Sequence, residues 1–441
     1  MITRLRHWLH RRRHPLRYAH LDALLRTQSL KREDLLARQQ RDLADIVEFA
    51  AAHTPYYAET LALFLQDGRF DPGTLPILKK DDVIRRLDDL LARHPNQSQA
   101  DRSQAKIGHT GGSTGKPLAF WYDDAKHELM RAGMMRSYML SGWRPGQKIL
   151  NFWGARQDVV PGGVFGAQLG DAIAAEHTIS AYEYTEAQLV EWARFIQRYR
   201  PVLLQGYASV LAEVARAVIE NRLAMPKTLL GVYSTAEVLT EAQRQRMQQA
   251  FGCKVFNQYG SREIPNIACE CSHGRLHVFT DMVFLESRKI DDENRLLLTS
   301  LTNRLMPMIR YDIGDSGRLL DGECDCGLPF PLMEMDLCRQ NDLIRTSSGK
   351  TVHPSYFNRL LYGQTQIRQY QWVQRDLGQL ELNLVAPPLG RETLATLEAS
   401  IRRDVDARMV LKVHHLDDIP RTVSGKHRFV IGLGASQPGH P

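Results

Sequence analysis

The chain has 441 residues, of which 43% are hydrophobic and 24% charged, and its net charge is +7. This composition is that of a globular protein with two or three domains, and no run of about 18 apolar residues predicts a transmembrane helix. The first residues lack the apolar core of a secretory signal, so we expect a cytoplasmic protein. Basic and aromatic patches do not recur through the body of the chain, which argues against nucleic-acid binding.

The positive charge is concentrated in residues 1–20, which hold six arginines, four histidines and no acidic residue. Ile2, Leu5, Trp8 and Leu9 fall on one face of a predicted helix, opposite the arginines. We interpret this segment as a basic amphipathic leader that can make weak contact with an anionic membrane surface or a partner. A solvated leader is the alternative.

The next part of the chain has a helical hydrophobic period and then alternates between helices and strands. Helices are expected at 21–52, 79–92 and 123–141. The following predicted strands are 148–153, 202–205, 229–234 and 254–258, and the predicted helices between them are 186–200, 208–220 and 241–251. Short strands separated by amphipathic helices predict an α/β sheet with helices on both faces.

After about residue 277 strands follow one another without helices, at 276–286, 295–300 and 308–311. The last hundred residues predict strands at 369–375 and 379–385, a helix at 392–408 and a strand at 410–415. The expected fold is α/β with a second, small α+β domain. We expect an N-terminal domain at 21–338, with a β-rich subdomain at about 268–338, and a mobile C-terminal lid domain at 339–441.

A glycine-rich stretch, residues 107–117, reads IGHTGGSTGKP. Glycines let backbone N–H groups approach a ligand, and consecutive N–H groups in such a turn form an anion site. The hydroxyl groups and the lysine add donors suited to phosphate. The spacing is not that of a P-loop, and taken alone the stretch is equally a surface turn. The candidate phosphate-binding residues are Thr110, Gly111, Gly112, Ser113, Thr114, Gly115 and Lys116.

Two further segments follow predicted strands, where ligands bind in open α/β sheets. Residues 257–263 (NQYGSRE) offer a flat ring and a hydroxyl at Tyr259, and a carboxylate at Glu263 that can hold Mg²⁺ on phosphate oxygens. Residues 234–237 (STAE) can place their backbone against a ring such as adenine. Either segment alone is also compatible with an ordinary turn that ends a strand.

Two motifs nearer the C-terminus add a carboxylate and a positively charged lysine. Residues 308–317 end a strand with Gly314-Asp315, and an acid in that position suits the two hydroxyls of a ribose. Residues 420–426 (PRTVSGK) place Lys426 on a glycine turn, from which it can reach a developing negative charge. Taken singly, these motifs are an ordinary Gly-Asp turn and a solvated lysine.

Together, in this order over residues 105–430, the four motifs resemble those of the adenylate-forming superfamily, which contains acyl-CoA synthetases and peptide-synthetase adenylation domains. The branch that the chain resembles most is that of phenylacetate–CoA ligase and its capsule-biosynthesis relatives. The segments similar to the superfamily are His109–Pro117, Tyr259–Glu263, Tyr311–Asp315 and Pro420–Lys426, and those similar to the branch are Tyr259–Glu263, Ala268–Cys271, Leu276–Val278 and Met306–Tyr311.

This resemblance implies that ATP activates a carboxylic acid as an acyl-adenylate, which CoA then converts to a thioester. Thr110, with the glycine-rich loop to Lys116, would hold the β- and γ-phosphates, and Glu263 would hold Mg²⁺. Lys426 would bridge the substrate carboxylate and ATP. The other implied contacts are adenine at Ala236, Glu237 and Tyr259 with Gly260 and Ser261 beside it, ribose at Asp315 and Arg339, and the pantetheine arm of CoA at Gly349.

The usual hinge motif of the family, Gly-Arg-x-Asp, reads Cys338-Arg-Gln-Asn341 here, which leaves the details of the second half-reaction open. Two alternatives remain. The first is an adenylate-forming enzyme that passes the acyl group to an amine or hydroxyl acceptor in polysaccharide or natural-product biosynthesis. The second is a non-catalytic nucleotide-binding scaffold. By analogy the acyl pocket involves residues 153–166 and 205–208 and Ser234.

Two groups of cysteines are spaced as metal ligands. One contains Cys269, Cys271, His273 and His277, and the other is Cys324-Asp-Cys326. In a cytosolic protein such spacing indicates a metal before a disulfide, and tetrahedral Zn²⁺ takes Cys and His ligands. The resemblance points to a structural zinc held by Cys271, His277, Cys324 and Cys326, with His273 in reserve. Reduced thiols in the core are the alternative.

Overall fold

The computed structural model describes residues 2–65, 70–93, 105–109, 118–153, 175–181, 184–290, 293–339, 344–348, 351–352, 356–357, 360–361, 364, 366–420 and 428–433. By their internal contacts these residues form two compact units. The large unit contains the described residues up to Glu334 apart from Gly314–Ser316, and the small unit contains Gly314–Ser316 and the described residues from Met335 onward.

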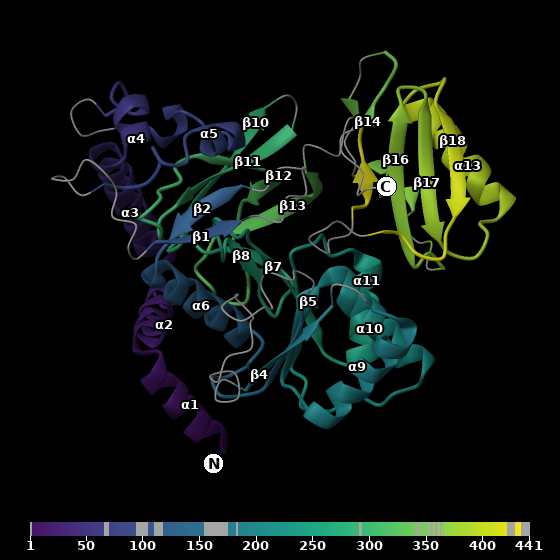
Figure 1. The fold of residues 1–441 in the computed structure, drawn as a ribbon, viewed down its shortest axis with the longest axis horizontal. Coiled ribbons are helices and arrows are strands. Elements are labelled where there is room, and N and C mark those ends of the chain that lie inside the picture. The colour runs from purple at the N-terminus through teal and green to yellow at the C-terminus, as the bar shows by residue number, and fades with distance from the viewer. Residues whose placement is uncertain are drawn as a thin grey trace. The chain divides into compact units, whose positions relative to one another are not determined.

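The main sheet has 11 strands among the described residues, in the order β10-β11-β12-β13-β9-β8-β7-β6-β5-β3-β4 (Figure 1). One half is parallel and consists of β3 (Ile149–Trp153), β4 (Glu176–Ser180), β5 (Leu203–Tyr207), β6 (Gly231–Thr235) and β7 (Lys254–Tyr259). The other half consists of β8 (Ala268–Glu270), β9 (Leu276–Val278), β10 (Val283–Ile290), β11 (Glu293–Ser300), β12 (Tyr311–Leu320) and β13 (Leu332–Arg339).

The strands expected in a β-rich subdomain therefore extend the same sheet as the parallel strands. The single strand expected at 276–286 is in fact two strands, β9 and β10, because the chain turns at Phe279–Met282, where the Met282 N–H donates to the Phe279 carbonyl oxygen at 2.9 Å. Only Thr280 and Asp281 interrupt the apolar residues here, so hydrophobic periodicity alone does not reveal the turn.

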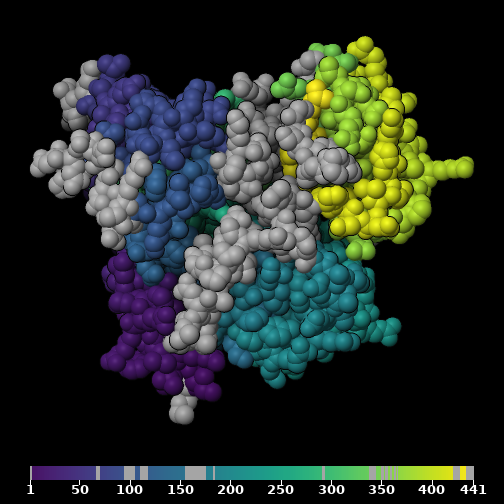
Figure 2. Space-filling model, in the orientation of Figure 1, coloured from purple at the N-terminus to yellow at the C-terminus, as the bar shows by residue number. Residues whose placement is uncertain are grey.

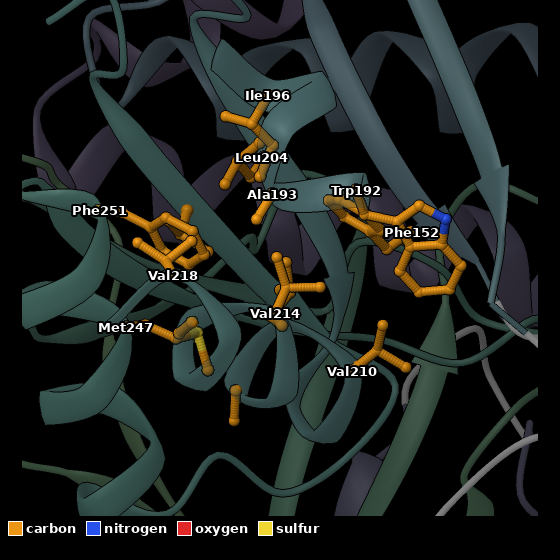
Figure 3. Close-up of a cluster of buried hydrophobic side chains, with 14 of the residues drawn as sticks. Phe152, Trp192, Ala193, Ile196, Leu204, Val210, Val214, Val218, Met247 and Phe251 are labelled. Atoms are coloured by element: carbon orange, nitrogen blue, oxygen red, sulfur yellow. The ribbon is translucent and has the colours of Figure 1, made fainter. Parts of the chain in front are cut away.

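Helices cover both faces of the parallel half, which confirms the α/β class. The helices α9 (Glu186–Tyr199), α10 (Ala208–Glu220) and α11 (Glu241–Phe251) pack on one face, where a cluster of apolar side chains fills the space between helices and strands (Figure 3). The helices α2 (Pro15–Gln28), α3 (Arg32–His53) and α6 (Asp124–Met139) contribute to a second cluster on the other face. Capping boxes at Thr185 and Gln188 and at Thr240 and Gln243 fix where α9 and α11 begin.

The N-terminal part of the large unit differs from the sequence-based expectation in detail. The helical run expected at 21–52 is divided between α2 and α3, and the helix expected at 79–92 is only α5 (Lys80–Arg85). The remaining elements are α1 (Ile2–Arg13), α4 (Pro55–Thr60), the turn of 3-10 helix at Pro72–Thr74 and the hairpin of β1 (Lys106–His109) with β2 (Ala119–Tyr122).

The small unit has the strand-strand-helix-strand order expected for the C-terminal region. Its four-stranded sheet has the order β18-β17-β16-β19, and Trp372, with no exposed surface, lies in its core. The elements are β14 (Ile344–Arg345), β15 (Thr351–Val352), β16 (Gln369–Asp376), β17 (Gln379–Val385), α13 (Arg391–Asp404), β18 (Val410–His415) and β19 (Val430–Ile431). In the described part of the chain, we find no helix long and apolar enough to cross a bilayer.

Candidate active site and metal centre

Two of the predicted nucleotide-binding segments follow neighbouring parallel strands. β6 and β7 pair in register, with Thr235 opposite Gln258. Ala236 comes directly after β6, and Gly260 comes directly after β7. Because parallel strands end at the same edge of a sheet, the fold brings Ala236 and Glu237 to the edge at which the Tyr259–Glu263 loop begins, where open α/β sheets bind ligands.

The segment after β6 has a strained backbone and an occupied carboxylate. Ala236 has φ +66, a left-handed conformation that non-glycine residues rarely adopt and that is concentrated at functional sites. The Glu237 Oε2 accepts a hydrogen bond of 2.8 Å from the backbone N–H of Ser209, in the first turn of α10. The residue at the N-cap of α10, Tyr207, supplies no capping side chain, so Glu237 caps this helix from a distance. This carboxylate thus has a structural partner, and the backbone of the segment remains for a ligand.

The loop after β7 is held by a buried lysine. Lys126, in the first turn of α6, lies with its Nζ 2.7 Å from the carbonyl oxygen of Glu263 and 4.9 Å from the centroid of the Phe120 ring. Burial lowers the pKa of Lys126 from 10.5 to about 8, against the opposing effects of the Glu263 and Asp123 carboxylates. An ammonium group is costly to bury without partners, so this contact fixes the loop strongly.

Further contacts tie the same loop to its surroundings. The Asn266 side-chain amide donates to the Met130 carbonyl oxygen at 2.9 Å, and the backbone of Asn266 has φ +55. Arg262 Nη1 donates to the carbonyl oxygen of His109 at 2.9 Å, at the end of β1. The Tyr259–Glu263 loop is therefore connected to β1, the strand that leads into the glycine-rich stretch.

Glu263 itself is 6% exposed, and the Tyr311 hydroxyl lies 3.5 Å from its Oε1. Mg²⁺ binds one or two protein carboxylates together with phosphate oxygens. The Glu263 carboxylate, in the loop after β7, is suited to be such a ligand. Tyr311 comes directly after Met306–Arg310, which packs closely: Ile309 N–H donates to the Tyr57 hydroxyl at 2.8 Å, and Arg310 forms a buried ion pair with Glu286 at 3.0 Å. These contacts fix the chain that leads into Tyr311.

Several predicted site residues lie outside the described residues. The structure does not describe the glycine-rich stretch, Thr110–Lys116, or Lys426. The predicted CoA contact Gly349, the predicted hinge residue Asn341 and residues 154–166 of the acyl pocket also lie outside the described residues. Asp315 was expected at the end of a strand but lies in the middle of β12, because the strand continues past Gly314 to Leu320; it is 8% exposed, and Gly314 has φ +80. Arg339 is placed by its backbone, as the last residue of β13.

Sequence reasoning missed Lys126, the Arg262 contact and the Tyr311 hydroxyl. A signal for Lys126 did exist, because it is spaced at i, i+3 and i+7 with Leu129 and Gly133, both on the packed side of α6. A lysine on an apolar stripe is unusual in a helix, since lysine is almost never fully buried unless it is paired.

Four of the predicted metal ligands converge in the large unit. The ligand atoms of Cys271, His277, Cys324 and Cys326 all lie within 4.8 Å of one another. Cys271 comes directly after β8, His277 lies in β9, and the two remaining cysteines lie in the turn between β12 and β13. The Sγ atoms of Cys271 and Cys324 are 3.7 Å apart, and Cys326 Sγ is 3.3 Å from His277 Nε2.

These separations fit one tetrahedral ion. Zn–S bonds of about 2.3 Å and Zn–N bonds of about 2.0 Å place sulfur atoms roughly 3.8 Å apart and sulfur and nitrogen roughly 3.5 Å apart. His277 Nδ1 is 3.1 Å from the Phe330 carbonyl oxygen, which can only accept, so Nδ1 carries the proton and Nε2 faces the cysteines with its lone pair. Burial lowers the pKa of His277, which keeps the imidazole neutral, the form that binds a metal.

The remaining cysteine and histidine side chains of the two groups differ in their surroundings. Burial raises the pKa of Cys326 to about 12, so a bound cation is what would make this sulfur a thiolate at neutral pH. His273 is exposed and contributes its backbone N–H, which donates to Cys271 Sγ at 3.3 Å, while its ring is not part of the group. Cys269 lies in the apolar cluster beside α6. The geometry selects His277 over His273 as the candidate ligand.

Comparisons with known proteins agree with this fold. Residues 344–432 match the family described as the CapK C-terminal domain. Protein CapK of Staphylococcus aureus is 24% identical over 418 residues, which cover 90% of this chain and 89% of that protein. Phenylacetate-coenzyme A ligase of Thermus thermophilus is 28% identical over 457 residues, which cover 92% and 98%.

Solved structures show the same fold. The 2-hydroxyisobutyryl-CoA ligase in the postadenylation state, in complex with R3-HIB-AMP, superposes with a TM-score of 0.71 at 17% identity, over 92% of this chain and 91% of that one. The anthranilate CoA ligase AuaEII superposes with a TM-score of 0.53 at 12% identity, over 75% and 67%. Along nearly its whole length the chain is therefore similar to CapK and to phenylacetate-coenzyme A ligase, its residues 344–432 match the CapK C-terminal domain family, and its fold is that of the solved acyl-CoA ligases.

Proposed function

We propose that this protein activates a carboxylic acid with ATP as an acyl-adenylate and then transfers the acyl group to CoA. The observation that carries the proposal is the buried Glu263 carboxylate, which lies near the Tyr311 hydroxyl in the loop after β7. Lys126 fixes the backbone of Glu263 through its carbonyl oxygen, and the strained Ala236 lies at the same sheet edge. The similarity to phenylacetate-coenzyme A ligase over 98% of that protein supports the same assignment.

In the first step an oxygen of the substrate carboxylate attacks the α-phosphorus of ATP, and the bond from that phosphorus to the bridging oxygen of pyrophosphate breaks. Pyrophosphate leaves with the bonding electron pair. The chain contributes positioning and charge neutralisation, which such transfers chiefly require. Thr110–Lys116 would hold the β- and γ-phosphates, Ala236 and Tyr259 would flank adenine, and Lys426 would face both substrate and ATP. Glu263 would hold Mg²⁺, which neutralises phosphate charge when bound.

In the second step the thiol of CoA attacks the acyl carbon, the bond to the adenylate oxygen breaks and AMP leaves. Asp315 and Arg339 would bind the ribose, and Gly349 would contact the pantetheine arm. We further propose residues 339–441 as a lid domain that turns between the two steps, with Asn341 in the place of the usual hinge aspartate. Asn can adopt unusual backbone angles, so the exchange is compatible with a hinge.

We also propose that Cys271, His277, Cys324 and Cys326 hold a structural Zn²⁺. The ion would join the turn after β8 to the turn before β13. Four protein ligands leave no open position for water or substrate, which is the arrangement of a structural rather than a catalytic site.

A second acceptor is favoured by one observation. The part of the chain that would face the acceptor, residues 344–432, matches the CapK C-terminal domain family. An amine or hydroxyl acceptor in polysaccharide or natural-product biosynthesis is therefore the alternative to CoA. The adenylation step and its residues are the same in both cases.

The test is ATP–pyrophosphate exchange across a panel of aryl, fatty and amino acids, with and without CoA. Exchange with one acid class is expected, and CoA is expected to consume the adenylate and release AMP. Lys426→Ala should abolish exchange while leaving the melting temperature unchanged. Adenylate that persists with CoA but is consumed by an amine or hydroxyl would establish the alternative acceptor. Absence of exchange with every acid, in folded and metal-loaded protein, would favour the non-catalytic scaffold.

A further inference from the structure

The first helix exposes a strip of large apolar side chains. Ile2, Leu5 and Trp8 in α1 are 66%, 56% and 50% exposed, and Leu9 is also exposed. At about 100° per residue these four lie within one third of the helix circumference. Leu16, at the start of α2, is exposed as well. Single exposed apolar residues are normal on a protein surface, but four on one face of a single short helix mark an interaction site.

The opposite face of α1 is docked on the large unit. His10 is buried, its Nδ1 lies 2.9 Å from the Tyr18 hydroxyl, and the His7 ring lies 5.4 Å from the Tyr18 ring. A Cβ placed on Gly146 would be 2.5 Å from the Thr3 carbonyl oxygen, so the helix backbone rests directly on this glycine. The docked face fixes which way the helix presents its apolar strip: away from the unit.

Arginines border this strip on both sides. By the helical period, Arg4 and Arg11 lie along one margin and Arg6 and Arg13 along the other. Arg12 lies within the strip, and its guanidinium carbon is 4.2 Å from the centroid of the Trp8 ring. The arginines therefore flank the apolar residues rather than occupying the opposite face, which carries Thr3, His7 and His10.

We propose that α1 docks this protein on the surface of an anionic bilayer. The 12-residue helix is about 18 Å long, is too short to span a bilayer, and combines an apolar strip with a basic border, as interfacial helices do. Trp8 and the aliphatic side chains would enter the boundary between headgroups and acyl chains, while the arginines extend to lipid phosphates. Complementary charge selects anionic lipid, since residues 1–20 contain no acidic side chain.

In Figure 2 the purple N-terminal helices form part of the surface of the large unit, so a flat bilayer can reach them. A nucleic acid would use the arginines but not the apolar strip, and a second copy of the chain would bring like charges together at the border. The bilayer surface is the occupant that uses both features at once.

The test is co-sedimentation of the full chain with vesicles of phosphatidylcholine alone or with about one third phosphatidylglycerol, at physiological and high salt. We expect at least tenfold stronger binding to the anionic vesicles, and weaker binding at high salt. The variant L5E/W8E should lose at least tenfold, and R12Q/R13Q should lose about fivefold per arginine, since each basic residue near the surface contributes about that factor.

Matched controls are Leu63→Glu, at another exposed leucine of the large unit, and Arg85→Gln, at an exposed arginine of α5; both should bind as the wild type does. All variants should keep the wild-type melting temperature. Equal binding to both vesicles, or binding to neither, would overturn the proposal. So would lipid-free self-association that L5E/W8E abolishes, which would assign the strip to a second copy, or retention of random-sequence nucleic acid without vesicle binding.

Discussion

The two ends of strand β8 are built in different ways. The loop that carries Glu263 enters the strand at Ala268, and the turn that carries Cys271 leaves it after Glu270. The strand has three residues, so the two regions are separated by about 10 Å of extended chain. At the cysteine end, side chains named by the motif make the contacts themselves. At the glutamate end, a lysine 137 residues earlier holds a backbone carbonyl.

This difference teaches which sites a sequence reveals. A metal centre depends on side-chain atoms whose chemistry is specific to Cys and His, so spacing marks the candidate ligands, from which the resemblance selected four. A carbonyl oxygen is present in every residue, so nothing in a sequence marks the one that a distant ammonium will reach. Substitutions at one end of β8 should therefore leave the other end unchanged.

Removing the ion should affect the cysteine end most. We expect one Zn²⁺ per chain in purified protein and none in the Cys324→Ser variant, measured by metal analysis. The free energy of unfolding should fall by several kcal/mol, up to the roughly 10 kcal/mol that zinc contributes to small zinc domains. Cys253→Ser is the matched control, because Cys253 lies outside the group and should leave the metal in place. Full metal content in Cys324→Ser would contradict the assignment.

Changing the carboxylate should affect only the glutamate end. Glu263→Gln removes the charge that would hold Mg²⁺, and ATP–pyrophosphate exchange should fall by about a hundredfold or more. Zinc content and melting temperature should not change, because the amide keeps the shape of the side chain. Glu334→Gln, at an exposed carboxylate paired with Arg318, is the control and should exchange at the wild-type rate. Undiminished exchange in Glu263→Gln would remove Glu263 from the proposed mechanism.

The fold was predictable where its signals are local. Amphipathic and alternating apolar patterns predicted the bounds of α10, α11 and β17 to the residue, because each of these segments carries one pattern from end to end. The division between β9 and β10 was missed, because the two polar residues of the turn, Thr280 and Asp281, are flanked closely by apolar residues on both sides. The strand order is also a long-range property: β13 pairs with β9 across more than fifty residues.

The candidate site follows the same rule. Cys271, His277, Cys324 and Cys326 were predicted, and the fold brings them together. The motif around Glu263 was recognised as well, but not its support by Lys126, Asn266 and Arg262. Their contacts join segments that are distant in sequence, and no local pattern records such a pairing. Contact of Glu237 with adenine stays a prediction, and the capping of α10 by its carboxylate is a contact that the sequence did not indicate.

Removing the ammonium group should loosen the glutamate end without unfolding it. Lys126→Met keeps the length of the side chain, loses the hydrogen bond to the Glu263 carbonyl oxygen, and relieves the burial of a charge. These two effects on the free energy of unfolding oppose each other, so the variant should stay folded. Because the loop that carries Glu263 loses a fixed contact, we expect ATP–pyrophosphate exchange to fall by about tenfold. Lys106→Met, at an exposed lysine paired with Asp124, should exchange normally.

The pH dependence of stability gives a readout specific to Lys126. Its folded pKa of about 8 lies below the usual 10.5, so between these pH values the unfolded chain binds a proton that the folded chain has lost. Stability relative to Lys126→Met should therefore be constant below pH 8 and should rise toward pH 10.5, by at most about 3 kcal/mol. Denaturant unfolding across this range measures the difference, and a flat difference would show that the ammonium is not desolvated.

The smallest effect concerns the segment after β6. Glu237→Ala removes the acceptor that caps α10, and should lower the free energy of unfolding by about 1 kcal/mol, the usual contribution of a helix cap. Glu237→Gln keeps an acceptor oxygen and should lose less than half as much. Because we assign adenine to the backbone here, neither change should alter the KM for ATP by more than about twofold. A tenfold rise in the KM for ATP with Glu237→Gln, at unchanged stability, would show that the carboxylate itself contacts the nucleotide. The segments that follow β6 and β7 would then both bind ligand through side chains.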